Sequence, residues 1–211
     1  AAAKLKERIR TVAKDLHIPK NEIPSRLKEI AQAFFMRNLD PAVEGWAKGA
    51  PVDWNPETGL GNAYSVYSYA THIAEVEVDL ITGEVSVEDF VAVHDSGRIA
   101  NHQLASGQVE GGIVQGLGFA LMEEISQKDG HLITTGFTTY RIPTIRDVAP
   151  NIEVGFIEAI YSKGPFGAKG LGEVPLMASH TAVSRAVAHA LGAAVNTYPL
   201  SPERVKELVC R

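Results

Sequence analysis

The sequence is nearly free of cysteine, since Cys210 is the only one among its 211 residues. A single thiol rules out a disulfide framework, and it rules out a zinc or iron–sulfur site built from cysteine ligands. Chains without disulfides are typical of reducing compartments. We therefore expect a cytoplasmic protein.

Long apolar runs and an excess of positive charge are also missing. No apolar run reaches the roughly 18 residues that a membrane helix requires, so we expect no membrane span. Lys and Arg number 20 against 25 Asp and Glu, which gives a formal net charge of −5 and argues against binding to nucleic acid. The chain begins at Ala1 without the apolar segment of a secretory signal, and we interpret Ala1 as a processing, subunit or cloning boundary.

The spacings by which proteins hold metals or build hydrolase nucleophiles are absent as well. Seven histidines are scattered along the chain: His17, His72, His94, His102, His131, His180 and His189. None belongs to an HExxH motif or to another paired-ligand spacing, and no GxSxG motif occurs. We therefore expect no metal ion held by protein side chains.

The composition that remains is that of an ordinary globular protein, 45% hydrophobic and 21% charged, long enough for one large or two small domains. Apolar residues recur at helical spacing over residues 2–16 and again over residues 25–38, which predicts two amphipathic helices. Residues 40–63 are rich in proline and glycine and predict a long loop. We accordingly divide the chain into residues 1–62, with the helices and this loop, and residues 63–211.

The second part has the strongest strand signal. Apolar and polar residues alternate over residues 71–79 and again over 84–88, which predicts a β-hairpin with Gly83 in its turn. Another strand is expected at residues 152–157. Helices are expected over residues 101–125, 175–191 and 203–209. Hairpins and separate helices together predict an α+β fold, a mixed hairpin sheet with packed helices.

A first glycine cluster lies inside a predicted helix. Five of the twelve residues from Gly107 to Gly118 are glycine, which costs about 3–5 kcal/mol of helix stability if each glycine costs about 0.5–1 kcal/mol. One interpretation is tight packing of two helices. The other is a bulky ligand lying against bare backbone, with Gln108 or Gln115 supplying amide hydrogen bonds.

A second glycine cluster, residues 164–173, leads into the predicted helix at Pro175. A loop rich in backbone N–H groups at a helix N-terminus is a generic cradle for anions, although the Lys-Ser/Thr ending of a phosphate-binding loop is missing. Lys169 is either part of such a cradle or a solvated loop lysine. Glu173 is either an acid favoured by the helix dipole or a general base held at a ligand, and spacing alone does not decide between them.

Several ordered motifs, together spanning most of residues 60–210, resemble one protein family. They are HIAEVEVD at residues 72–79, DSGRIAN at 95–101, GQVEGGIVQGLG at 107–118, YRIPTIRD at 140–147, GPFGAKGLGE at 164–173 and SPERV at 201–205. The family is the molybdenum hydroxylases, of the xanthine dehydrogenase and aldehyde oxidase type. The resemblance is to the C-terminal part of their molybdopterin-binding subunit, and it implies the fold of the C-terminal half of that domain for residues 63–211.

The resemblance also implies a reaction and the residues that perform it. Such enzymes hydroxylate an aldehyde or an N-heterocycle, here of a purine or nicotinate-like kind, with water as the source of oxygen. Their molybdenum is held by a pterin, which the resemblance suggests is a dinucleotide form, and not by side chains. Glu173 matches the family's general base. The cofactor-binding residues implied are Gly107, Gln108, Lys169, Gly170, Leu171 and Gly172.

Partners follow from the same resemblance. Family subunits are much longer than this chain, and nothing here matches their upstream half. We therefore expect an upstream molybdopterin-binding domain or chain to complete the pocket, and iron–sulfur and flavin (FAD) subunits to carry electrons away from a small-molecule substrate. The chain alone is expected to be inactive. Two alternatives are a non-catalytic scaffold or assembly subunit that completes a partner's cofactor pocket, and a nucleotide-binding module that uses the Lys169 loop.

Overall fold

The computed structural model describes residues 1–210, which fall into two units, residues 1–50 and the residues from Pro51 onward. The first unit contains helix α1 (Ala2–Asp15), the short 3-10 helix η1 (Lys20–Glu22) and helix α2 (Leu27–Met36). Its small core joins the apolar faces of α1 and α2 and includes Val12, Ile30 and Phe34. The two amphipathic helices predicted from apolar spacing are therefore confirmed.

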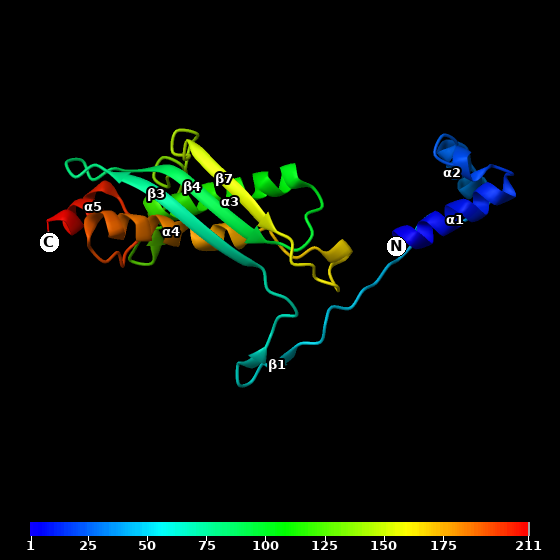
Figure 1. Ribbon diagram of the computed structural model, residues 1–211, viewed down its shortest axis with the longest axis horizontal. Helices are drawn as coiled ribbons and strands as arrows, with labels where there is room; N and C mark the ends of the chain where they lie inside the picture. The colour runs from blue at the N-terminus through cyan, green and yellow to red at the C-terminus, as the bar shows by residue number, and fades with distance from the viewer. Residues whose placement is uncertain (211) are drawn as a thin grey trace. The chain divides into compact units, whose positions relative to one another are not determined.

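The second unit is built on a three-stranded sheet of β3 (Tyr69–Val78), β4 (Val85–Asp95) and β7 (Asn151–Ile157), in the order β3-β4-β7 (Figure 1). Strands β3 and β4 are the predicted antiparallel hairpin, and Gly83 has a φ of +78° in their connection. Strand β7 pairs with β4 in parallel. Two short hairpins lie outside this sheet: β1 (Asp53–Asn55) with β2 (Leu60–Asn62), and β5 (Gln127–Lys128) with β6 (His131–Leu132).

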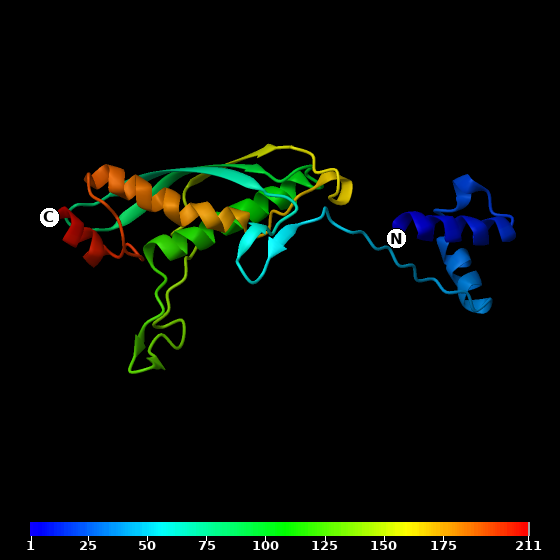
Figure 2. The ribbon, with the colours of Figure 1, turned by 90° about the horizontal axis from the view of Figure 1, so that it is seen from below.

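Helices α3 (His102–Leu121) and α4 (Val174–Leu191) lie side by side along one face of this sheet (Figure 2). The core between sheet and helices contains Phe90 and Ala92 of β4, Val109 and Ile113 of α3, and Val183 of α4. A short last helix, α5 (Pro202–Val209), packs through Val205 in a smaller cluster. These elements confirm the predicted α+β fold.

The division of the chain differs from the one predicted. The structure separates the units after Ala50, whereas the proline- and glycine-rich composition suggested a boundary after residue 62. The difference arises because the β1–β2 hairpin, with every residue exposed, is part of the second unit. No helix within residues 1–210 is long and apolar enough to span a bilayer.

Candidate functional site

The two glycine clusters, far apart in the sequence, meet at the N-terminal ends of α3 and α4. The side-chain Nε2 of Gln108, on α3, donates a hydrogen bond of 2.9 Å to the backbone carbonyl oxygen of Gly172, just before α4. Gln108, Gly172 and the following residue Glu173 are all exposed. One exposed surface therefore brings together predicted cofactor-binding residues from both clusters.

Helix α3 begins beside this surface because Asn101 caps it. The Asn101 side-chain oxygen accepts a hydrogen bond of 3.1 Å from the backbone N–H of Leu104, which satisfies one of the free donors of the first turn. The apolar residues of the helix, such as Val109 and Ile113, are fully buried against the sheet. The opposite side of α3 presents Gln108 to solvent.

The glycines of α3 serve two different purposes. At Gly112 and Gly116, an added Cβ would lie 2.6 Å from the Cβ of Pro175 and 2.4 Å from the Cβ of Ser179, so these two glycines allow α3 and α4 to pack closely. At Gly107 and Gly111, an added Cβ would meet nothing within 4 Å. The packing interpretation therefore holds for one pair, and the other pair leaves bare backbone facing open space.

The second glycine cluster is fastened to the end of β4. The backbone N–H of Lys169 donates to the carbonyl oxygen of Ser96 at 2.8 Å, and Ala168 forms an isolated antiparallel bridge with Gly97. The hydroxyl of Ser68 donates to the carbonyl oxygen of Gly170 at 2.8 Å. Backbone groups of three consecutive loop residues, 168–170, are thus bonded to other parts of the chain.

Lys169 is not a solvated loop lysine. Its ammonium Nζ lies 2.6 Å from Oδ2 of Asp95, and the two side chains are only 9% and 13% exposed. The hydrogen bond from Lys169 holds the pKa of the Asp95 carboxyl below its usual range. Because this ammonium is engaged by a carboxylate and the Lys169 N–H donates to Ser96, Lys169 can contribute to a bound ligand through its backbone carbonyl oxygen and not through a free positive charge.

The outer side of the same loop is open. An added Cβ at Gly170 or Gly172 would meet nothing within 4 Å. Within residues 1–210, the backbone N–H groups of residues 170–172 have no protein acceptor. This segment therefore offers several hydrogen-bond donors and space for close approach, as a ligand that lies flat on the backbone requires.

Glu173 is the N-cap residue of α4, which agrees with the prediction that this acid lies near a helix N-terminus. Its side chain makes no capping hydrogen bond and is exposed beside the Gln108–Gly172 contact. The carboxylate is therefore available to a ligand on this surface. Its position agrees with both interpretations drawn from the sequence, a helix N-terminal acid and a general base.

Two groups near this surface were not predicted from the sequence. One is Asp95, because a lone aspartate at a strand end carries no signal of its buried lysine partner. The other is a hydrogen-bonded line of His72, His94 and Ser179 beneath the first turn of α4. The alternation over residues 71–79 indicates that His72 is partly buried, but it carries no signal of the partners of the ring. No group of three or more metal-ligating side chains occurs within residues 1–210.

The sequence model of the family described as "Molybdopterin cofactor-binding domain" matches residues 1–149. This match begins at the first residue, so it includes the N-terminal helices. The motifs described above lie after residue 60 and gave no match for these helices. It ends before Glu173.

Two curated relatives are similar over most of the chain. An aldehyde oxidoreductase of Megalodesulfovibrio gigas is 34% identical over 164 residues, which are 77% of this chain and 18% of the relative. The xanthine dehydrogenase molybdenum-binding subunit of Escherichia coli O157:H7 is 37% identical over 153 residues, 72% of this chain and 20% of that subunit. The chain thus spans about a fifth of the length of these relatives.

A solved structure extends the similarity to the complete chain. The crystal structure of quinoline 2-oxidoreductase from Pseudomonas putida 86 is similar with a TM-score of 0.71 and 28% identity. The similarity covers 100% of this chain and 28% of that one. The α+β arrangement described above is therefore one found in a solved oxidoreductase of greater length.

Proposed function

This chain belongs to the molybdopterin cofactor-binding domain family, and from this premise we propose that it forms part of a molybdenum hydroxylase that oxidises an aldehyde or an N-heterocycle. The observation that carries the proposal is the Gln108–Gly172 hydrogen bond, which joins two stretches of side-chain-free backbone on one exposed surface. In this proposal Glu173 is the general base.

The residues present fit a pterin cofactor. A pterin is flat and polar, so it needs close approach to backbone and several hydrogen-bond partners at once. Gly107, Gly111, Gly170 and Gly172 leave the space that a Cβ would occupy on either side of Gln108. The second Nε2 hydrogen and the carbonyl oxygen of the Gln108 side chain, together with the N–H groups of the loop, supply donors and an acceptor.

When bound, the molybdenum cofactor would supply the redox chemistry of the hydroxylation. The chain's own residues would orient the cofactor and remove a proton from the attacking oxygen. Gln108 and the backbone from Lys169 to Gly172 would hold the pterin edge, and Glu173 would accept the proton that leaves the attacking oxygen. The ion pair of Lys169 with Asp95 would keep the loop, and with it Glu173, in one place.

Exchange of Glu173 tests this proposal in the complete molybdenum enzyme that includes this chain. We expect Glu173→Gln to lower turnover by at least about 100-fold, since general base catalysis contributes about 10²–10⁴-fold. Molybdenum content should be retained, because the carboxylate is not a ligand. Glu203→Gln, an exposed glutamate in the first turn of α5, is the matched control and should keep turnover. Turnover near wild type in Glu173→Gln would favour the scaffold alternative.

The remaining assignments are also part of this proposal. We propose that a longer chain or a partner supplies the rest of the cofactor pocket, because this chain spans about a fifth of its relatives. The E. coli relative is named as a subunit, which supports a multi-subunit enzyme. Iron–sulfur and FAD partners, the dinucleotide form of the pterin, the class of substrate and the cytoplasmic location stay predictions.

A further inference from the structure

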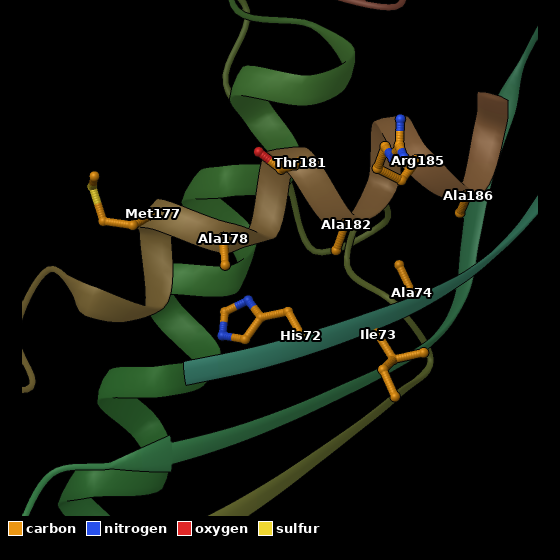
Figure 3. Close-up of a pocket in the computed structure, with 9 residues that line it drawn as sticks. All are labelled: His72, Ile73, Ala74, Met177, Ala178, Thr181, Ala182, Arg185 and Ala186. Atoms are coloured by element: carbon orange, nitrogen blue, oxygen red, sulfur yellow. The ribbon is translucent and has the colours of Figure 1, made fainter. Parts of the chain in front are cut away.

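A line of three hydrogen-bonded side chains runs beneath the first turn of α4. His94 of β4 and Ser179 of α4 are fully buried, and His72 of β3 lies between them. The two histidine Nε2 atoms are 2.9 Å apart, and Nδ1 of His72 is 3.1 Å from Oγ of Ser179. Figure 3 shows the His72 ring reaching from β3 toward α4 beside Ala178. These contacts connect the centre of the sheet to the helix that carries Glu173 at its N-cap.

The direction of every hydrogen bond in this line follows from its last member. The hydroxyl of Ser179 lies 2.6 Å from the carbonyl oxygen of Pro175, and a carbonyl oxygen can only accept. Ser179 therefore donates its single hydrogen to Pro175 and must accept one from Nδ1–H of His72. In a neutral imidazole the other nitrogen is an acceptor, so Nε2 of His72 accepts from Nε2–H of His94.

The start of the line agrees with this direction. Nδ1 of His94 is buried and has no hydrogen-bond partner. In the arrangement just derived this nitrogen carries a lone pair and no hydrogen. The reverse arrangement would place an N–H there without an acceptor, and orphaned buried N–H groups are rarer in proteins than under-used acceptors. The line therefore has one favoured direction, from His94 through His72 and Ser179 to Pro175.

Both rings are neutral in this arrangement. Burial lowers the pKa of His72 to about 4, with a smaller contribution from His94. Burial also lowers the pKa of His94. A proton added to His72 would direct an N–H at Nε2 of His94, which would force the hydrogen of that ring onto its partnerless Nδ1.

The line ends two residues after Glu173, and a second anchor lies before it. Consecutive residues of β4 hold the two segments that flank the carboxylate. Asp95 binds Lys169 in the preceding loop through the 2.6 Å ion pair, and His94 holds Pro175 in the following turn through His72 and Ser179. The backbone of Glu173 is therefore fixed from both sides by the end of one strand.

We propose that His94, His72 and Ser179 are positioning residues, a one-directional hydrogen-bond line that orients the first turn of α4 and thereby the carboxylate of Glu173. This inference rests on the proposed function, in which Glu173 is the general base. It assigns these three residues no contact with substrate or cofactor. Their contribution is to hold one orientation of a base whose effectiveness depends on distance and angle.

The first test measures the hydrogen positions in the full chain labelled with ¹⁵N-histidine. Nitrogen chemical shifts at neutral pH should show His72 protonated on Nδ1 and His94 protonated on Nε2, with both rings neutral. Ser179→Ala should change the tautomer of His72, because Nδ1–H then loses its acceptor. Ser184→Ala should leave both rings unchanged, since this second buried serine of α4 bonds to Thr181 and Tyr198. The opposite tautomers, or a charged ring at neutral pH, would overturn the proposal.

The second test measures catalysis in the complete molybdenum enzyme with the same pair of variants. Ser179→Ala should lower kcat about tenfold or more, with KM and molybdenum content kept, because only the orientation of the base is loosened. Ser184→Ala should keep kcat within about twofold. An equal loss of molybdenum in Ser179→Ala would show a general structural role and overturn the positioning role.

The two proposals fail in different ways. Wild-type kcat in Ser179→Ala together with an inactive Glu173→Gln would overturn the positioning role alone. An active Glu173→Gln would overturn the proposed function, and the positioning role with it, whatever the tautomers are.

Discussion

Gln108 and Gly172 lie 64 residues apart in the chain, and the side chain of one donates to the backbone of the other at 2.9 Å. This single bond connects the N-terminal half of α3 to the loop before α4. It also places the bare backbone at Gly107 and Gly111 on the same exposed surface as the bare backbone at Gly170. The relationship is specific enough to be tested by substitution.

Removal of the Gln108 side chain should weaken cofactor binding. In the complete enzyme, Gln108→Ala loses the bond to Gly172 and the remaining amide groups, and one such bond contributes about 0.5–1.5 kcal/mol, so we expect about a 2–10-fold loss of affinity. The measurement is the molybdenum and pterin content of the purified protein. Gln127→Ala, which removes an exposed glutamine of β5 outside the glycine clusters, is the control. Unchanged occupancy in Gln108→Ala would remove this residue from the site.

Two glycine substitutions in α3 should change stability in opposite directions. Gly111→Ala meets open space and removes the flexibility of glycine from a helix, so it should raise the free energy of unfolding by about 0.5–1 kcal/mol. Gly116→Ala would place a Cβ 2.4 Å from that of Ser179, so it should lower the free energy by about 1–3 kcal/mol. Urea denaturation of the chain measures both, without any cofactor. Equal effects would contradict the division of these glycines into two kinds.

A glycine that faces open space, Gly170, should affect how much cofactor the enzyme binds. Gly170→Ala fills space that the proposal reserves for the pterin, so molybdenum content should fall in the complete enzyme although the apo chain stays as stable as wild type. Gly136→Ala, which also meets nothing within 4 Å but lies outside the glycine clusters, is the matched control. Full molybdenum content in Gly170→Ala would show that the space around this residue is not used.

Loss of the charge on Asp95 should loosen the loop. Asp95→Asn leaves the 9% exposed Lys169 without a counter-charge, and we expect a loss of about 1.5–3 kcal/mol of unfolding free energy at neutral pH. Asp40→Asn breaks the exposed ion pair with Arg8 and should cost about 0–1 kcal/mol. Thermal or urea unfolding compares the two. A loss in Asp95→Asn no larger than that in Asp40→Asn would mean that the ion pair does not hold the loop.

Stability should fall as the pH drops from about 6.5 toward 4. The folded chain lowers the pKa of His72 to about 4 and lowers that of His94, so in this window the unfolded chain binds protons that the folded chain does not. The folded state is therefore favoured above this window and loses about 1.4 kcal/mol per pH unit through His72, and the lowered pKa of His94 acts in the same direction. The His72 ring lies against Phe90 of β4 and Ser179 of α4, and Arg185 of α4 lines the same pocket as His72.

Unfolding curves across this pH range, compared with those of His72→Gln, measure the effect. The variant should show a shallower slope, whereas the exposed His131→Gln should match wild type. The carboxyl of Asp95 acts in a lower window, since its pKa is depressed from 3.8 and its stabilisation is lost only as that group is protonated. A wild-type slope in His72→Gln would show that this ring is not kept neutral by the fold.

Elements with a strong local pattern were predictable from the sequence. The alternation over residues 71–79 became β3, and the helix expected over residues 175–191 became α4, with Pro175 in its first turn and Gly192 as its C-cap. The β1–β2 hairpin was not predictable, because its strands have three residues each, all exposed, and bury no apolar face. The parallel pairing of β7 with β4 is a contact between distant segments and leaves no local signal.

Some features of the candidate site were likewise predictable from the sequence, and others required the tertiary structure. Residue order and glycine content determined which segments lack side chains, that Glu173 stands at the start of a helix, and which family the motifs resemble, because these are properties of neighbouring residues. Only the tertiary structure decided which glycines serve helix packing and which face open space, that Lys169 is neutralised by Asp95, and that two histidines and a serine meet under α4. Those facts depend on contacts between residues up to 107 positions apart, and a packing distance exists only after the sheet and helices have come together.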